Sequence, residues 1–369
     1  MNHDLPSLVP VRPLPAADSR EVQLISRRYR RNRGAAIKLS RPQHRLVAQM
    51  EERLRSGAYT LTSGACVCGD VDGAVIAQVD RYGLALDTVL CATCGTLRTD
   101  PYLVPHDLDH FYRHCYQALY ARVPDPPSYF QRQRQYGKRL IEWARPQLPV
   151  HGAIAEVGCG AGGALSVFVE AGHRIAGCDY SEALVMYGRL RGVCGLQVGD
   201  IETLADARAI GGPFDLLLLH HVFEHLADPI AVLRQALQLI SSHGLIVVAV
   251  PDVARCDKFR DKRGNLRLYL HVAHKFNFTL CGLHLLADRL GLTASVMDIE
   301  PDRNAPELWV AFGRDRAGLP AHEAEHWTNP EELYSTLRTI EREFVRRERL
   351  TLIRRRLEQS VRNWFDRAK

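Results

Sequence analysis

The most constraining feature of this chain begins near Gly152, where short apolar runs start to alternate with helical stretches. Such alternation is typical of a parallel sheet covered by helices on both faces. The runs with the length and composition of strands lie at residues 153–157, 174–178, 195–198, 214–219, 245–250, 294–299 and 308–312. The sequence therefore predicts an α/β domain built on a doubly wound sheet of seven strands.

The first of these strands leads into a glycine-rich segment, AEVGCGAGG, at positions 155–163. Glycines at such a place permit a tight turn and let a ligand approach the backbone amides closely. Gly158, Gly160 and Gly163 also match the G-x-G-x-x-G pattern of dinucleotide sites, for which Asp179 could be the ribose acceptor. By itself the loop indicates a nucleotide-type ligand and leaves its class open.

Three acidic residues narrow the choice of ligand. Glu156 lies two residues before the first glycine, Asp179 ends the second strand, and Asp200 follows the third. Carboxylates accept hydrogen bonds from hydroxyls and amines, and they attract the sulfonium and ammonium groups of S-adenosylmethionine. Over roughly residues 150–315 the pattern resembles the Rossmann-like class I S-adenosylmethionine-dependent methyltransferases.

This resemblance implies a cofactor role for His221, which follows the fourth strand, and for a set made up of Glu156, Gly158, Gly160, Gly162, Asp179, Asp200 and Ile201. In that family the residue matching Glu156 and the glycine turn hold the methionine part. The acid matching Asp179 binds the ribose hydroxyls, and the one matching Asp200 meets the adenine amino group. Ile201 is expected to pack on the adenine ring.

The segment HHVFEHLADP, at positions 220–229, lies where ligands bind in open α/β sheets. It is similar to the E-H signature of small-molecule methyltransferases. We expect His221 to face the cofactor and the acceptor, whereas Glu224 and His225 either take part or hold the following helix. Quinol O-methyltransferases bind a divalent ion with a comparable cluster. Because His221 stands where a further acid would help, we expect no metal at this cluster.

A basic insertion after the fifth strand is the expected acceptor side. Its end, YLHVAHKFNFT at positions 269–279, is similar to an element of sugar methyltransferases with the approximate pattern YxEHxxYFS. The similarity aligns His274 with the histidine, Ala273 with the glutamate and His271 with the tyrosine. Imidazole titrates near neutral pH, so we expect His274 to remove a hydroxyl proton, with His271 as a second catalytic candidate. Because Ala273 replaces the glutamate, O-methylation is supported at least as well as C-methylation.

Four of the ten cysteines have the spacing of metal ligands: Cys66 and Cys68 precede Cys91 and Cys94 by 22 intervening residues. Four thiolates suit a structural, tetrahedral zinc ion, and reduced core cysteines are the alternative. A four-cysteine module ahead of a methyltransferase body resembles bacterial sugar methyltransferases with an amino-terminal zinc-binding domain. The resemblance implies a sugar-bearing small molecule as the acceptor, in glycan or secondary-metabolite biosynthesis.

Changes in composition divide the chain into five expected segments. They are a basic arm and helix (1–57), a zinc-binding module (58–104), a helical connector (105–150), the methyltransferase domain (151–315) and a carboxy-terminal helical extension (316–369). We expect the arm to be flexible. The extension has the spacing of a long amphipathic helix, which would pack on the body or on a second subunit and so form a homo-oligomer. Binding to an anionic membrane or to RNA is the alternative for this helix.

Composition and charge exclude several classes of protein. Apolar residues make up 46% of the chain and charged residues 24%, which is typical of a soluble globular protein. No apolar run approaches the roughly 20 residues of a membrane helix, and scattered cysteines without an export signal suit a reducing compartment. We therefore expect a cytoplasmic protein without a transmembrane segment.

Two rival functions remain open at this stage. An RNA methyltransferase with an amino-terminal zinc module would use the six arginines between positions 20 and 33 to bind phosphates. The net charge of +6 is too small to favour nucleic acid as a partner by itself. The second rival is a non-catalytic scaffold, against which the intact set of Glu156, Asp179 and Asp200 argues.

Overall fold

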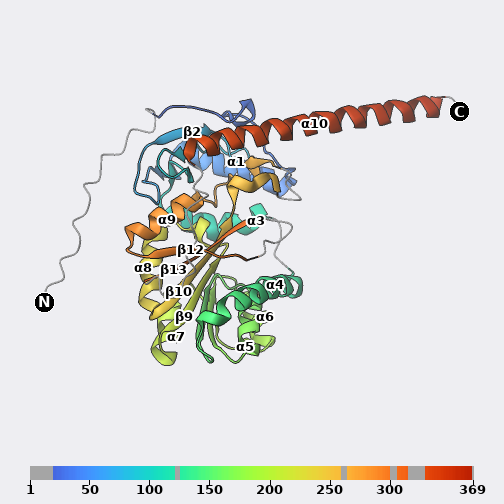
Figure 1. The fold of residues 1–369 in the computed structure, drawn as a ribbon. Helices are drawn as coiled ribbons and strands as arrows, with labels where there is room; N and C mark the ends of the chain where they lie inside the picture. Colours follow the sequence, from blue (N-terminus) through green and yellow to red (C-terminus); the bar gives the residue numbers. More distant parts are fainter. Residues whose placement is uncertain (1–19, 121–124, 259–263, 300–305, 315–328, 368–369) are drawn as a thin grey trace.

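The computed structural model describes residues 20–120, 125–258, 264–299, 306–314 and 329–367, without the side chains of 209–211 and 361–367. Figure 1 shows a central sheet flanked by helices, a smaller β-rich module at one end of that sheet, and a long helix. This helix, α10 (Pro330–Arg367), crosses the module and extends beyond it.

The central sheet has seven strands in the order β12-β13-β10-β9-β6-β7-β8. Their bounds are β6 Ala153–Val157, β7 Arg174–Asp179, β8 Leu196–Val198, β9 Phe214–His220, β10 Ile240–Pro251, β12 Thr293–Val296 and β13 Glu307–Gly313. All seven predicted strands are present, and β13 is antiparallel to both of its neighbours. The first residue of β13 therefore lies at the edge where the parallel strands end.

Helices cover both faces of this sheet, as predicted. The helices α4 (Pro126–Ala144), α5 (Gly163–Glu170) and α6 (Glu182–Leu190) pack on one face, and α7 (Thr203–Gly211), α8 (Pro229–Leu239) and α9 (Leu280–Arg289) pack on the other. Successive side chains of a strand point to opposite faces, so Leu216 and Leu218 join the first core while Leu217 and Leu219 join the second. Asp228 and Thr279 cap α8 and α9 as expected.

The amino-terminal module contains a four-stranded sheet to which the insertion between β10 and α9 contributes one strand. Its strands are β2 (Gly73–Ala77), β3 (Thr88–Cys91), β4 (Leu97–Thr99) and β11 (Phe276–Asn277), in the order β11-β4-β3-β2. The pairs Phe276–Arg98 and Asn277–Leu97 join β11 to β4. The module is therefore held against the segment that carries His271 and His274.

The remaining elements lie in the module, in the connector between module and body, and in loops of the body. They are β1 (Leu61–Thr62), β5 (Tyr102–Leu103), α1 (Arg41–Ser56), α2 (Pro105–Phe111), a π-helical turn (Tyr112–Tyr116), α3 (Gln117–Tyr120) and 3₁₀ turns at Arg27–Tyr29, Arg145–Gln147, Phe223–His225, Val253–Lys258 and Leu266–Leu268. Aromatic side chains of this connector pack together, as the sequence suggests. None of the helices in the described part of the chain is long and apolar enough to cross a membrane.

Residues 20–33 differ from the flexible arm that we expected, whereas residues 1–19 lie outside the described chain. Val22 forms a parallel bridge with Val75 of β2. The buried guanidinium of Arg20 lies 2.8 Å from the Asp100 carboxylate, and Arg31 lies 3.1 Å from Asp87. Backbone pairing and ion pairs fix this segment. The carboxylates come from the surrounding module, so the composition of residues 20–33 alone does not indicate these ion pairs.

Candidate active site

The glycine loop connects β6 to α5 and adopts backbone conformations that favour glycine. Gly158 and Gly160 have φ values of 69° and 52°, which L-residues rarely adopt. A Cβ at Gly158 would lie 2.3 Å from Cγ2 of Val222, and one at Gly160 would lie 2.5 Å from Cε1 of Tyr129. Both positions therefore bring neighbouring side chains against the backbone of the loop.

A side chain that sequence reasoning missed, Gln133 of α4, holds the far end of this loop. It is 2% exposed, and its Oε1 accepts hydrogen bonds from the N–H groups of Ala161 and Gly163, both at 3.2 Å. Its Nε2 donates to the carbonyl of Cys159 at 2.7 Å. Gly162, in a left-handed conformation, precedes α5 between these contacts. The amides at the start of α5 are thus bound by the protein itself.

Glu156, near the end of β6, has one satisfied and one unsatisfied carboxylate oxygen. Its Oε1 accepts a hydrogen bond of 2.7 Å from the hydroxyl of Tyr136, whereas Oε2 has no hydrogen-bond partner among the described residues. The side chain is 0% exposed, and this burial raises the pKa of Glu156 to about 8. An unpaired acceptor in a buried place fits a ligand that brings a donor or a positive charge.

The other two acids lie at the neighbouring strand ends. Asp179 ends β7 and accepts hydrogen bonds from the N–H groups of Gly160 at 2.8 Å and Ser181 at 2.7 Å. Burial raises the pKa of Asp179, although the two amides act in the opposite direction. Asp200 follows β8 and is half-buried, and the neighbouring Ile201 is buried. The three acids thus lie at the carboxyl ends of three neighbouring strands of the sheet, as the sequence indicates.

His221 lies between two carboxylates. Its Nδ1 is 3.2 Å from Oε1 of Glu224, and its Nε2 is 2.7 Å from Oε1 of Glu307. Burial alone would lower the pKa of His221, but the two carboxylates raise it to about 10. Burial acts in the opposite direction on Glu224 and would raise its pKa. The hydrogen bond with His221 outweighs this effect and lowers the pKa of Glu224 to about 2. At neutral pH His221 is therefore an imidazolium that donates from both nitrogens.

Glu224 also faces two further histidines. The Nε2 of His225 lies 4.0 Å from Oε1 of Glu224, while its Nδ1 is 3.0 Å from the carbonyl oxygen of Ala273 and donates to it. The Nδ1 of His274 is 3.4 Å from the amide oxygen of Asn277. Burial lowers the pKa of His274 well below its ordinary value. His274 is therefore neutral at pH 7, with one ring nitrogen that carries a proton and one that can accept a proton.

Two groups of side chains at this edge have donor atoms close enough to hold a metal ion. Ligand atoms of Glu224, His225 and His274 all lie within 4.8 Å of one another, and the same holds for His220, His221 and Glu307. Two imidazoles and a carboxylate are donors that suit several divalent transition metals. Glu224 and His274 are 50 positions apart, so no local pattern in the sequence indicates that they share a site.

His271 contacts the aromatic connector. Its Nδ1 is 2.6 Å from the hydroxyl of Tyr120, and its ring centroid is 3.7 Å from that of His274. Tyr112 and Tyr116, from the same connector, both contact the ring of His225. The connector thus forms an aromatic wall next to the two histidines. The sequence indicated the packing of these tyrosines but gave no sign that they adjoin the site.

The four clustered cysteines meet within the module. The Sγ atoms of Cys66 and Cys94 are 3.5 Å apart, as are those of Cys68 and Cys91, and all four lie within 4.8 Å of one another. Four thiolates at about 2.3 Å from a tetrahedral zinc ion would be about 3.7 Å apart. The observed spacing therefore fits such an ion and is far longer than a disulfide bond of about 2 Å.

Comparison with known proteins identifies the central part of the chain. Residues 129–295 match the family described as "Methyltransferase domain". Together with the seven-stranded sheet, this match shows that the chain contains a class I S-adenosylmethionine-dependent methyltransferase domain.

Curated relatives match the same region over part of their length. The ubiquinone biosynthesis O-methyltransferase of Stutzerimonas stutzeri is 26% identical over 144 residues, which are 38% of this chain and 62% of that protein. Its counterpart in Ruegeria sp. is 34% identical over 94 residues, which are 25% and 38% of the two chains. The chain therefore spans less than two thirds of the length of these relatives.

Solved structures with a similar fold include two methyltransferases crystallised with S-adenosylhomocysteine (SAH). Magnesium protoporphyrin IX methyltransferase from Synechocystis is 16% identical, with a TM-score of 0.41, over 57% of this chain and 99% of that chain. The plantazolicin methyltransferase BpumL, in complex with a triazolic analogue and SAH, is also 16% identical, with a TM-score of 0.41, over 57% and 98%.

Proposed function

We propose that this protein transfers a methyl group from S-adenosylmethionine to a hydroxyl group of a small molecule. The observation that carries the proposal is the buried imidazole of His274, which burial keeps neutral at pH 7 by lowering its pKa. It lies beside Glu224 at the sheet edge where open α/β folds bind ligands. A neutral histidine at this place can accept the proton that a hydroxyl loses on methylation.

On the cofactor side, the unpaired Oε2 of Glu156 is proposed to accept from the ammonium group, with Gly158, Gly160 and Gly162 shaping the turn around the methionine part. Asp179 is proposed to bind the ribose hydroxyls. Asp200 would accept from the adenine amine, with Ile201 packed on the ring. S-adenosylmethionine, when bound, supplies an electrophilic methyl group. These residues would contribute mainly by positioning it in line with the acceptor.

On the acceptor side, the histidines take different proposed parts. His274 is the proposed base. His271 is proposed to fix the position of His274, because their rings are in contact and Tyr120 holds His271 in turn. His221 is a cation held by two carboxylates, so it would orient the acceptor or the cofactor and would not take up a proton.

For the acceptor itself we propose a sugar-bearing small molecule, such as a nucleotide-linked sugar. The support is the resemblance of the four-cysteine module and of the segment at 269–279 to those of bacterial sugar methyltransferases. A phenolic ring is the second candidate. The wall formed by Tyr112, Tyr116 and Tyr120 favours an aromatic ligand, and the curated relatives are ubiquinone biosynthesis O-methyltransferases.

We also propose that Cys66, Cys68, Cys91 and Cys94 bind one structural zinc ion, because their sulfur atoms have the spacing of a tetrahedral site. All four positions of such an ion would be filled by protein, so it would take no part in methyl transfer. RNA is not the acceptor we propose. Arg20, Arg28 and Arg31 pair with carboxylates of the protein, which removes much of the basic arm from competition for phosphates.

The function is tested by incubating the protein with methyl-labelled S-adenosylmethionine and panels of nucleotide sugars, phenols and RNA, followed by mass spectrometry of the products. His274→Gln should lower turnover about 100-fold or more while leaving the cofactor Kd unchanged. The matched control is His243→Gln, at an exposed position of β10. Unchanged turnover of the His274 variant would remove this residue as the base. Label on RNA alone would replace the proposed acceptor.

A further inference from the structure

The long helix α10 is fixed to the body by its first half. Leu333 and Leu337 are fully buried against the module and the insertion. The buried carboxylate of Glu341 accepts hydrogen bonds from Arg28, at 2.8 and 2.9 Å, and from the hydroxyl of Tyr29 at 3.1 Å. Beyond these contacts the helix projects away from the body (Figure 1). Its second half therefore presents side chains that the described chain does not cover.

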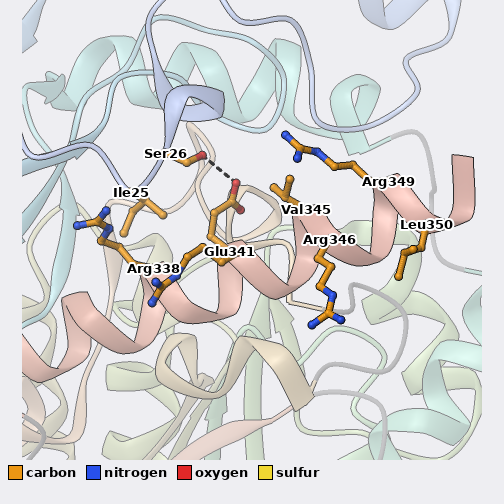
Figure 2. Close-up of a pocket in the computed structure, with 9 residues that line it drawn as sticks. Ile25, Ser26, Arg338, Glu341, Val345, Arg346, Arg349 and Leu350 are labelled. Carbon is orange, nitrogen blue, oxygen red and sulfur yellow. Dashed lines mark hydrogen bonds between the residues drawn. The ribbon is translucent and has the colours of Figure 1, made fainter. Parts of the chain in front are cut away.

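A basic groove runs along α10 where the helix leaves the body, and Figure 2 shows the residues that line it. Four of them are arginines: Arg338, Arg342, Arg346 and Arg349. Within the described residues, none of the ion pairs involves these four side chains, and the one acid of the groove, Glu341, is already paired with Arg28. The groove therefore keeps a net positive charge that an anionic partner can neutralise.

An apolar stripe continues from this groove along the helix. Leu350 lines the groove and is 57% exposed, while Ile353 and Leu357 are 55% and 62% exposed. At about 100° per residue, spacings of three and four place these side chains on one face of the helix. Arg349 and Arg356 lie on one flank of this face, whereas Arg354, on the other flank, is paired with Glu358 at 2.8 Å. The stripe thus offers apolar side chains beside a basic border formed by Arg349 and Arg356.

Three kinds of partner could cover this surface. They differ in whether they neutralise the arginines and whether they remove the apolar side chains from water. The stripe of a second copy would bury Leu350 and Ile353 but would bring the flanking arginines of the two helices together, where like charges repel. Nucleic acid would neutralise the arginines and leave the apolar side chains in water. A bilayer with anionic headgroups satisfies both, because apolar side chains enter the acyl boundary while arginines reach the phosphates.

We propose that the second half of α10 binds an anionic lipid surface. Leu350, Ile353 and Leu357 lie in the boundary between headgroups and acyl chains, and Arg349 and Arg356 contact the phosphates. The helix lies along the surface and does not span it. The groove at Arg338 and Arg342 extends the same positive face toward the body. The contact places the methyltransferase domain at a membrane whatever its acceptor.

The proposal is tested with the full-length protein by flotation with vesicles of phosphatidylcholine alone and of phosphatidylcholine mixed with phosphatidylglycerol. We expect binding to the mixed vesicles only, weakening as salt concentration rises. The joint substitution Arg349→Gln and Arg356→Gln should lower the partition coefficient roughly 30-fold, at about fivefold for each arginine. The joint substitution Leu350→Ser, Ile353→Ser and Leu357→Ser should abolish binding.

Two residues on the opposite face of α10 provide matched controls, because they change the same residue types away from the stripe. Leu352→Ser and Arg355→Gln should each leave vesicle binding within about twofold of the unchanged protein. Circular dichroism would verify that every variant keeps its helix content. The proposal is overturned if the protein fails to float with anionic vesicles, or if the controls lose binding as fully as the stripe variants. It is equally overturned if the stripe variants abolish only dimerisation, measured by sedimentation, or only binding to RNA.

Discussion

Oε1 of Glu307 lies 2.7 Å from Nε2 of His221, although the two residues are 86 positions apart in the chain. Glu307 begins the antiparallel strand β13 and pairs with Pro251 at the end of β10. A residue at the start of an antiparallel strand lies at the same edge as residues at the ends of parallel strands. Because β13 runs antiparallel to β10, Glu307 brings a second carboxylate to His221, opposite Glu224. The two carboxylates keep the histidine protonated at neutral pH.

We predict that Glu307→Gln lowers the pKa of His221 from about 10 toward its ordinary value. The pKa of His221 is higher in the folded protein than in the unfolded chain. The carboxylates therefore stabilise the folded state fully below about pH 6.5, and this stabilisation is lost as pH rises through about 10. The variant should lose roughly 1 to 3 kcal/mol at neutral pH. Histidine proton shifts by NMR and urea denaturation at several pH values measure the two effects. Exposed Glu202→Gln is the control, and a pKa unchanged by the Glu307 substitution would contradict the assignment.

We predict that the affinity for S-adenosylmethionine rises with pH up to about 8, because Glu156 must lose its proton to accept the positively charged cofactor. Glu156→Gln should weaken binding roughly 10- to 100-fold and remove this part of the pH dependence. Calorimetry in buffers of different ionisation enthalpy would detect the proton released on binding by the unchanged protein. Glu182→Gln, exposed on α6, should behave like the unchanged protein. An equal pH dependence in the Glu156 variant would place the titrating group elsewhere.

We predict one zinc ion per chain, detected by elemental analysis of protein purified without chelators. Cys91→Ser should lose the ion and the cooperative unfolding of the module, since structural zinc contributes about 10 kcal/mol or more to small domains. The exposed Cys194 lies outside the cluster, so Cys194→Ser should keep both. A Cys91 variant that keeps its zinc content and its stability would contradict the site. Zinc removal should also disturb the segment at His274, because β11 pairs with β4 of the module.

We predict that Glu341→Ala destabilises the protein by roughly 3 kcal/mol, because the substitution leaves Arg28 and the buried hydroxyl of Tyr29 without their partner. Urea denaturation measures the loss. The control is Glu343→Ala on the same helix, where the side chain is exposed and a change within about 0.5 kcal/mol is expected. If both variants lose the same amount, helix propensity accounts for the effect and the buried carboxylate does not.

Much of the fold could be predicted from sequence because its signals are local. The apolar runs at residues 153–157 and 214–219 have the length of buried strands, and Asp228 followed by Pro229 marks a helix start. The positions of Glu156, Asp179 and Asp200 relative to their strands follow from the same periodicity. That these residues bind the cofactor stays a prediction, because neither the geometry nor the family match tests individual roles.

What the sequence by itself determined is therefore the seven-stranded sheet, the glycine turn and the grouping of four cysteines, each of which depends on spacing within a short stretch of chain. Only the tertiary structure decided that Gln133 caps the loop, that Glu307 reaches His221, and that Arg20 and Arg28 are used in internal ion pairs. The physical reason is that the hydrogen-bond or ion-pair partner of such a group lies on an element that is distant in the chain. Spacing along the chain does not indicate which distant elements pack together.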